Sequence, residues 1–168
     1  MFASGFRACA GRVGRVAAAA LTASVIAASA ASADEITVRI DRVRALDKID
    51  SGLAGQADFY AIVTIAGEEF RTKVARGKDD LRPGWVFRKR VSAGKHDVKI
   101  RIFDRDPLKA DTSVDVNRVD NKRDLDFAVD TRSCIITGFS TPQRCGRTIN
   151  RSGQEKKKAE IWFRVNAR

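Results

Sequence analysis

Short runs in which apolar and polar residues alternate recur along this 168-residue chain from residue 35 to its end. In the run 98–103, every second residue is β-branched (Val98, Ile100 and Ile102), and the residues between them are Lys, Arg and Phe. This alternation is typical of a half-buried β-strand. No run within residues 34–168 shows the 3.6-residue period of an amphipathic helix, and turn-forming residues recur at short spacing. The sequence therefore predicts an all-β fold, an antiparallel β-sandwich of about eight strands.

The alternating runs predict strands in several segments of the chain, separated by loops. The expected strands cover residues 35–45, 58–65, 70–74, 85–91, 98–103, 114–116, 125–129, 134–137 and 159–165. In the first of them the alternation shifts phase at Val43, which predicts a β-bulge. The charged run 118–124 and the polar, glycine-bearing run 147–156 are expected to form loops.

Residues 1–33 have the composition of a cleaved secretory signal peptide. Arg7, Arg12 and Arg15 precede an apolar stretch at 16–28, and Ala31-Ser32-Ala33 provides small residues for cleavage. An uncleaved anchor is the alternative, but the apolar part is short for a membrane span. We therefore expect one exported domain, residues 34–168, located in a periplasm or secreted.

Two cysteines, Cys134 and Cys145, lie within that domain. An even number of cysteines in an exported protein predicts a disulfide, here closing a loop of about a dozen residues. A metal-binding pair is the alternative. It would lack further ligands nearby, since the domain has no other cysteine and its single histidine, His96, is far away in sequence.

The chain is strongly basic, with a formal net charge of +11 at pH 7. Such a charge favours anionic partners: lipid headgroups, polyanionic glycans or an acidic protein. Export makes nucleic acid the weakest candidate partner. Six cations alternate with apolar residues on expected strands and would form one basic face if those strands were neighbours: Arg71, Lys73, Arg88, Arg90, Lys99 and Arg101.

Three carboxylates follow the strand 98–103 within eight residues: Asp104, Asp106 and Asp111. Because like charges repel, a loop of this kind favours a cation with oxygen ligands, Ca²⁺ above all. The alternative is that these aspartates only cap turns, which needs no metal.

Four segments carry a family resemblance. Residues 58–63 (Asp-Phe-Tyr-Ala-Ile-Val), 70–73 (Phe-Arg-Thr-Lys), 83–87 (Pro-Gly-Trp-Val-Phe) and 98–106, which ends in Asp-x-Asp, are similar to motifs of C2 domains. These are the calcium-dependent phospholipid-binding sandwiches of protein kinase C and synaptotagmins. The resemblance covers about residues 36–115 and the closing strand.

The resemblance implies a set of ligands from two loops. The family's five acidic positions fall on Asp50, Asp58, Asp104, Asp106 and Asp111. The spacing of Asp50 to Asp58 is two residues longer than the family's, and Asp111 comes one residue early. Asp47 is a substitute for Asp50, and Asp115 is a spare ligand. Leu53 and Leu108 lie near the loop tips and are the expected apolar contacts with a membrane.

By resemblance, the protein is an exported Ca²⁺-binding module that docks on anionic phospholipid, or another anionic surface, through its acidic loops. The alternative is a calcium-independent binding or structural sandwich that contacts anionic lipid, glycan or protein through the basic face. An enzyme is not expected, because His96 has no nucleophile context nearby and the sequence has neither a Gly-rich phosphate loop nor a zinc motif.

Overall fold

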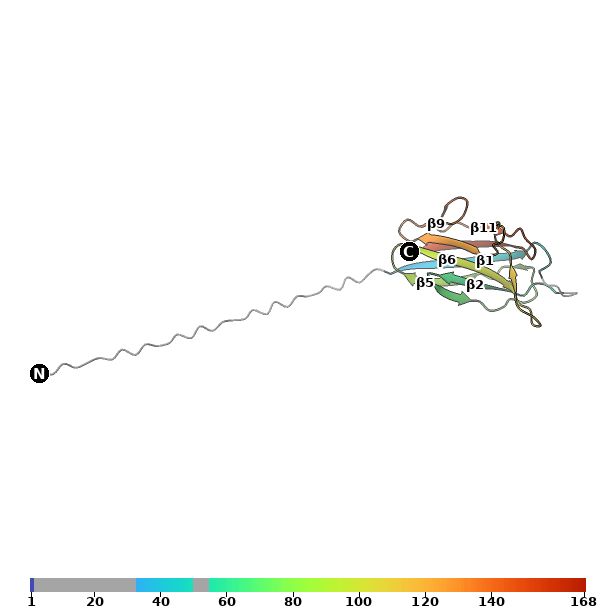
Figure 1. The fold of residues 1–168 in the computed structure, drawn as a ribbon, viewed down its shortest axis with the longest axis horizontal. Helices are drawn as coiled ribbons and strands as arrows, with labels where there is room; N and C mark the ends of the chain where they lie inside the picture. Colours follow the sequence, from blue (N-terminus) through green and yellow to red (C-terminus); the bar gives the residue numbers. More distant parts are fainter. Residues whose placement is uncertain (2–32, 50–54) are drawn as a thin grey trace. The chain divides into compact units, whose positions relative to one another are not determined.

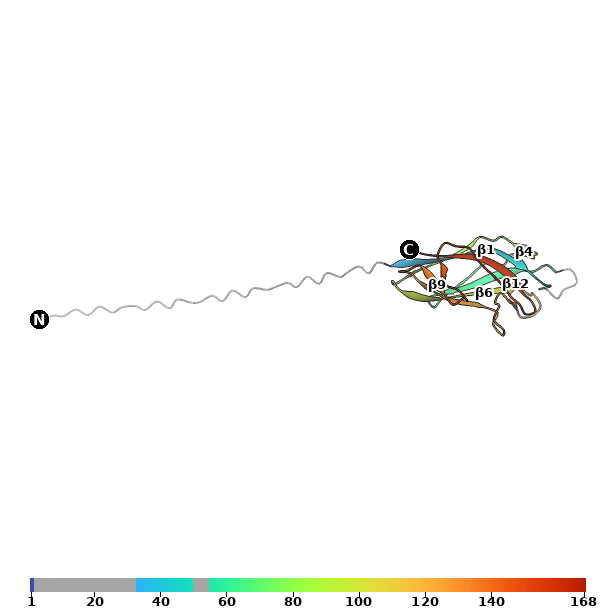
Figure 2. The ribbon, with the colours of Figure 1, turned by 90° about the horizontal axis from the view of Figure 1, so that it is seen from above.

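Two antiparallel β-sheets pack face to face in the computed structural model of the chain, which describes residue 1, residues 33–49 and residues 55–168 (Figures 1 and 2). The first sheet, sheet A, has the order β11-β12-β1-β4, with β5 also paired to β1. Its strands are β1 (Asp34–Ala45), β4 (Asp80–Leu81), β5 (Trp85–Val91), β11 (Ile149–Ser152) and β12 (Ala159–Ala167).

The second sheet, sheet B, has the order β10-β9-β8-β6-β2-β3, with β7 also paired to β6. Its strands are β2 (Phe59–Ile65), β3 (Glu68–Arg71), β6 (Lys95–Asp104), β7 (Thr112–Val114), β8 (Leu125–Asp130), β9 (Ile135–Thr137) and β10 (Gln143–Arg144). The predicted antiparallel sandwich is thus confirmed. The described residues form twelve strands rather than about eight, because several short strands extend the edges.

The long strand β1 has the predicted bulge. Its register against β12 shifts between Ile40 and Arg42. This shift restores the inward direction at Val43, whose side chain is fully buried. The twelve-residue strand is long enough to pair with β5 along residues 34–40 and with β4 at residues 43–44.

The core lies between the two sheets and consists of the inward-facing residues of the alternating runs. On β2, Phe59, Ala61, Val63 and Ile65 are fully buried between the layers. Each large apolar side chain that is buried in this way contributes about 1.5–3 kcal/mol. The same alternation directs Tyr60 to the outer face of sheet B.

The predicted disulfide forms between Cys134 and Cys145, which flank the β9–β10 hairpin, with their Cα atoms 5.4 Å apart. The expected loop at 147–156 is wrong in part, since Ile149–Ser152 forms β11 and pairs with β12. Its single apolar residue, Ile149, is buried in the core. One apolar residue is too little periodicity for the sequence to reveal a strand.

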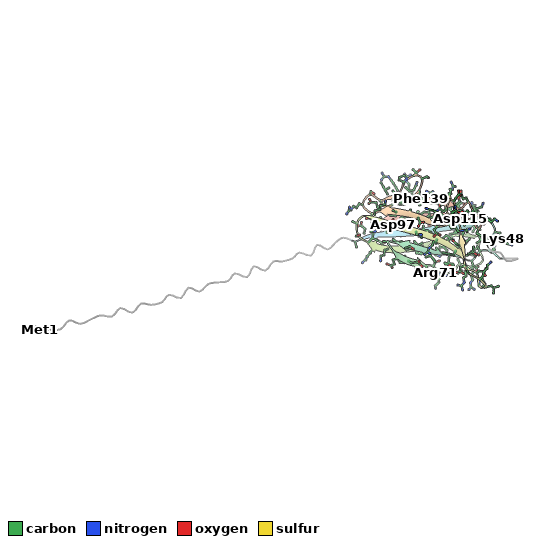
Figure 3. All side chains as sticks on the ribbon, viewed as in Figure 1. Met1, Lys48, Arg71, Asp97, Asp115 and Phe139 are labelled. Atoms are coloured by element: carbon green, nitrogen blue, oxygen red, sulfur yellow. A yellow bond between two sulfur atoms is a disulfide. The ribbon has the colours of Figure 1, made fainter. Side chains whose placement is uncertain are left out.

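Asp115 holds the segment after β7 against the segment after β11. The side chain is fully buried and accepts hydrogen bonds from the backbone amides of Asn117, Gln154 and Glu155 at 2.8–2.9 Å (labelled in Figure 3). Asp115 therefore anchors loops. No helix that could span a membrane occurs in the described residues.

Candidate functional site

The ends of β2 and β6 bring two aspartates from distant parts of the sequence together. Phe59 pairs with Asp104 in the antiparallel register, so Asp58 and Asp104 lie at the same end of the sandwich. The amide of Asp58 donates to Oδ1 of Asp104 at 2.6 Å, and the amide of Arg105 donates to the Asp58 backbone oxygen at 3.0 Å. The loops that the sequence proposed as partners are therefore neighbours.

A hydroxyl group, a backbone amide and two guanidinium groups of the chain itself surround the carboxylate of Asp111. Tyr60 donates its hydroxyl proton to Oδ2 of Asp111 at 2.7 Å, and the amide of Asp106 donates to Oδ1 at 3.2 Å. The guanidinium groups of Arg71 and Arg105 lie 3.5 and 3.6 Å from the same carboxylate. Both oxygens of Asp111 are thus already engaged.

Asp106 is neutralised locally within its own loop. Its Oδ1 accepts from the amide of Leu108 at 3.0 Å, and its Oδ2 lies 3.2 Å from Nζ of Lys109. The backbone hydrogen bond and the ammonium group hold the pKa of Asp106 below its ordinary value. This carboxylate therefore stays ionised without help from a metal.

The contact between Tyr60 and Asp111 shifts the pKa of both groups. The tyrosine hydroxyl, followed by the Asp106 amide and the two arginines, holds the pKa of Asp111 below its ordinary value. Burial of the phenol, and then its hydrogen bond to the carboxylate, raise the pKa of Tyr60 to about 12. Arg71 also lies over the Tyr60 ring, 4.2 Å from its centroid. These contacts fix Asp111 against the outer face of sheet B.

The described residues fit a calcium site only in part. Ca²⁺ takes six to eight oxygen ligands. The Asp104 carboxylate accepts from the Asp58 backbone amide, whereas Oδ1 of Asp58 accepts from the amide of Gly77 at 2.7 Å. Asp106 follows in the same loop as Asp104, but Asp111 turns toward Tyr60 and the arginines. Within the part of the chain that the structure describes, no three acidic, His or Cys side chains group as a metal-binding cluster. The predicted ligand Asp50 lies outside the described residues.

An apolar side chain stands at the tip of the loop 105–110. Leu108 is 95% exposed, and the cations Arg105 and Lys109 flank it. An exposed leucine between two cations suits the boundary between lipid headgroups and acyl chains. The other predicted apolar contact, Leu53, lies outside the described residues.

The predicted single basic face does not form. Arg88 and Arg90 are on β5 in sheet A, whereas Arg71, Lys99 and Arg101 are on strands of sheet B. The outward side chains of the two sheets point to opposite faces of the sandwich. Lys73 follows β3 at the edge of sheet B. Several of these cations also have acidic partners: Arg101 with Glu69 at 2.5 Å, Lys99 with Asp126 at 3.1 Å and Arg88 with Glu35 at 3.8 Å.

Sequence reasoning missed three residues of this site: Tyr60, Arg105 and Lys109. The sequence did contain an indication for Tyr60. The alternation on its strand directs its side chain outward, where it lies beside Arg71 of the neighbouring strand. Asp47, the proposed substitute ligand, instead accepts from the amides of the 157–158 turn at 3.0 and 2.9 Å. It therefore fixes a turn.

Comparisons with known proteins agree with this fold. A family model described as "C2 domain" matches residues 34–131. No curated protein matches this chain. A calcium-bound structure of two C2 domains of extended-synaptotagmin 2 is similar with a TM-score of 0.54 at 16% identity, over 79% of this chain and 45% of that one.

Two further solved structures show the same fold. Human GIVD cytosolic phospholipase A2 is similar with a TM-score of 0.52 at 19% identity, over 80% of this chain. The similarity covers 17% of the phospholipase chain, so this chain corresponds to a small part of that enzyme. A structure described as a C2 domain is similar over 80% of this chain and 97% of its own length, with a TM-score of 0.50 at 13% identity.

Proposed function

The chain belongs to the C2 domain family, and we propose that it docks on anionic phospholipid membranes through the loop 105–110 without requiring Ca²⁺. C2 domains are binding modules that generally bind membranes or lipids and often use calcium. The observation that carries the proposal is the pairing of Asp111 with Arg71 and Arg105. These cations supply the positive charge that a metal ion would otherwise bring to the loop.

The loop offers both interactions that a peripheral membrane protein needs. Three cations, Arg71, Arg105 and Lys109, accompany the two carboxylates Asp106 and Asp111 near the tip, so a net positive charge remains. A net positive charge near an anionic membrane contributes about 1 kcal/mol. Leu108 adds the transfer of an exposed apolar side chain into the interface. Because the electrostatic part is screened by salt, binding should weaken as ionic strength rises.

Sedimentation with phosphatidylcholine vesicles that contain phosphatidylserine tests this assignment of the loop. We expect Leu108→Ser and the double variant Arg105→Gln/Lys109→Gln each to weaken binding by about fivefold or more, since each removes about 1 kcal/mol or more. Val86→Ser, at an exposed apolar position on sheet A, and Arg88→Gln/Arg90→Gln are the matched controls. Equal losses in the controls and the loop variants would refute docking through this loop.

Calcium-dependent docking is the second candidate function, favoured by the position of Asp58 and Asp104 at the same end of the sandwich. Asp58, Asp104 and Asp106 would hold the ion. When bound, Ca²⁺ would add positive charge at this end of the sandwich and accept oxygen ligands from lipid phosphate.

We also propose that the domain is exported, to a periplasm or out of the cell. The Cys134–Cys145 disulfide supports this location, because disulfides persist mainly in oxidising compartments. Fusion of residues 1–33 to a reporter that is active only after export tests it, and a reporter retained in the cytosol would contradict it.

A further inference from the structure

Arg151 is a cation on the core-facing side of an edge strand. It lies on β11, at the edge of sheet A, and pairs in register with Ile161, which is fully buried. Directly opposed residues of antiparallel strands point to the same side, so Arg151 faces the inner side of the sheet. Its guanidinium lies over the ring of Phe139, 4.2 Å from the centroid (Phe139 is labelled in Figure 3).

This arginine has no acidic partner among the described residues. Its Nη1 donates to the backbone oxygen of Asn150 at 2.8 Å, which uses one of five donors. A contrast lies at the other edge of the same sheet, where Lys89 also faces inward and forms an ion pair with Glu68. Of these two inward-facing cations, Lys89 therefore has an acidic partner, whereas Arg151 has none among the described residues.

A second arginine lies close to Arg151. Arg118 is exposed, and its Nε lies 3.4 Å from Oγ of Ser152. Burial, and then the positive charge of Arg118, lower the pKa of Arg151. Two arginines without a carboxylate between them repel each other, and a bound anion would remove that repulsion.

The two arginines line a pocket of about 230 Å³. Lys122 adds a third cation, and Phe139, Val119 and Leu125 form an apolar wall. The one acidic side chain of the lining, Asp126, lies 3.1 Å from Lys99. This volume is below the roughly 300–1,000 Å³ of sites for drug-sized ligands, so the pocket suits a small anion.

We propose that this pocket binds a phosphate-type oxyanion, a phosphate group that is free or carried on a small apolar body. Arginine suits such a ligand because its planar donors match two phosphate oxygens at once. The Phe139 ring holds the Arg151 guanidinium in place before the ligand arrives, which limits the entropy lost on binding. The apolar wall provides contacts for the substituent of a phosphomonoester.

The pocket lies outside the loop 105–110 and includes residues outside the segment that matches the family model. Phe139, Ser140 and Arg151 lie beyond residues 34–131, which match the family model. Figure 3 shows Phe139 and Arg71 on opposite sides of the sandwich in that view. Phosphate binding in this pocket therefore does not require membrane docking through the loop 105–110.

Titration of the purified protein with inorganic phosphate tests the proposal, with thermal unfolding and calorimetry as readouts. A ligand bound only by the native state raises the unfolding temperature in a saturable way. We expect phosphate to do so beyond chloride of equal ionic strength. We also expect Arg118→Gln and Arg151→Gln each to weaken phosphate binding by about tenfold or more. Arg147→Gln, an exposed arginine of the same segment outside the pocket, is the control and should bind normally.

Binding to lipid vesicles distinguishes a lipid headgroup from a free phosphate as the ligand. Phosphatidic acid presents a phosphomonoester, and phosphatidylglycerol presents a phosphodiester as the matched anionic lipid. A selective loss of phosphatidic acid binding in Arg118→Gln assigns a lipid headgroup, and a loss confined to soluble phosphate assigns a free ligand. The proposal is overturned if phosphate produces no shift beyond chloride, or if Arg118→Gln and the Arg147→Gln control respond alike.

Discussion

Tyr60, the only tyrosine of the chain, joins the outer face of sheet B to the loop that carries the acidic residues. Its ring stacks on Phe103 with centroids 5.3 Å apart, and its hydroxyl holds Asp111. Asp111 in turn lies next to Arg71 and Arg105. The orientation of the carboxylate follows from these three neighbours, which come from β2, the end of β3 and the loop itself.

The variant Tyr60→Phe tests this contact. We expect it to lower the free energy of unfolding by about 1 kcal/mol near pH 7, because it removes a hydrogen bond to a partly buried carboxylate. The pKa of Tyr60 is raised to about 12, above the roughly 10 of an unfolded tyrosine. The contribution of the phenol is therefore complete below about pH 10 and is lost between about pH 10 and 12.

Urea denaturation at neutral and alkaline pH checks this expectation. The stability difference between wild type and Tyr60→Phe should shrink as pH rises above about 10, while lysines and arginines titrate alike in both proteins. Because only one tyrosine is present, phenolate absorbance reports its pKa directly. A midpoint near that of an unfolded tyrosine, about 10, in the folded protein would contradict the contact.

The residue-level site was only partly predictable from sequence. Alternation and the Asp-x-Asp motif were sufficient to bring Asp58 and Asp104 to one end of the sandwich, because antiparallel pairing follows from the strand pattern. The partners of Asp111 were not predictable in the same way. They depend on which strands adjoin β2 and on side-chain directions, which a single sequence does not contain.

At the scale of elements, the segment around β11 shows how short strands are hidden in a sequence. Its inward positions are Ile149 and Arg151, and an arginine breaks the apolar pattern that marks a strand. The prediction of a single basic face was wrong for a related reason. Alternation gives the two faces of each strand, but not the sheet to which β5 belongs.

Gly153 follows β11 at the close contact with Asp115. A Cβ atom at this position would lie 2.2 Å from the backbone oxygen of Asp115 and 2.6 Å from its Cγ. We therefore expect Gly153→Ala to lower the free energy of unfolding by about 1–3 kcal/mol, as overpacking does. Chemical denaturation measures this, with Ser152→Ala, at the preceding residue, as the control. A loss no larger than in the control would show that the contact is looser than the structure indicates.

At the scale of the whole molecule, the cations that the sequence assigned to one basic face are divided between the two sheets of the described residues. Acidic side chains pair with cations on both sheets, as in Arg42 with Asp80 and Arg101 with Glu69. Fold class, disulfide and bulge were all predictable from sequence, because each depends on local pattern or cysteine count. The distribution of charge was not, since it depends on how the two sheets are ordered.

The distribution of charge also determines how the protein binds a membrane. At the end of the sandwich that carries the loop 105–110, resident cations neutralise Asp106 and Asp111. Calcium is then not needed to remove the repulsion between these carboxylates and an anionic surface. Attraction remains because three cations, Arg71, Arg105 and Lys109, lie beside these two carboxylates and leave a net positive charge.

Vesicle binding in chelator and in millimolar Ca²⁺ tests this claim most directly, with the wild type and the double variant Asp104→Asn/Asp106→Asn. We expect the wild type to bind phosphatidylserine vesicles equally in both conditions, with binding lost steeply as salt increases. Binding by the wild type only with Ca²⁺, together with loss of that response in the double variant, would contradict it and establish the calcium-dependent function instead.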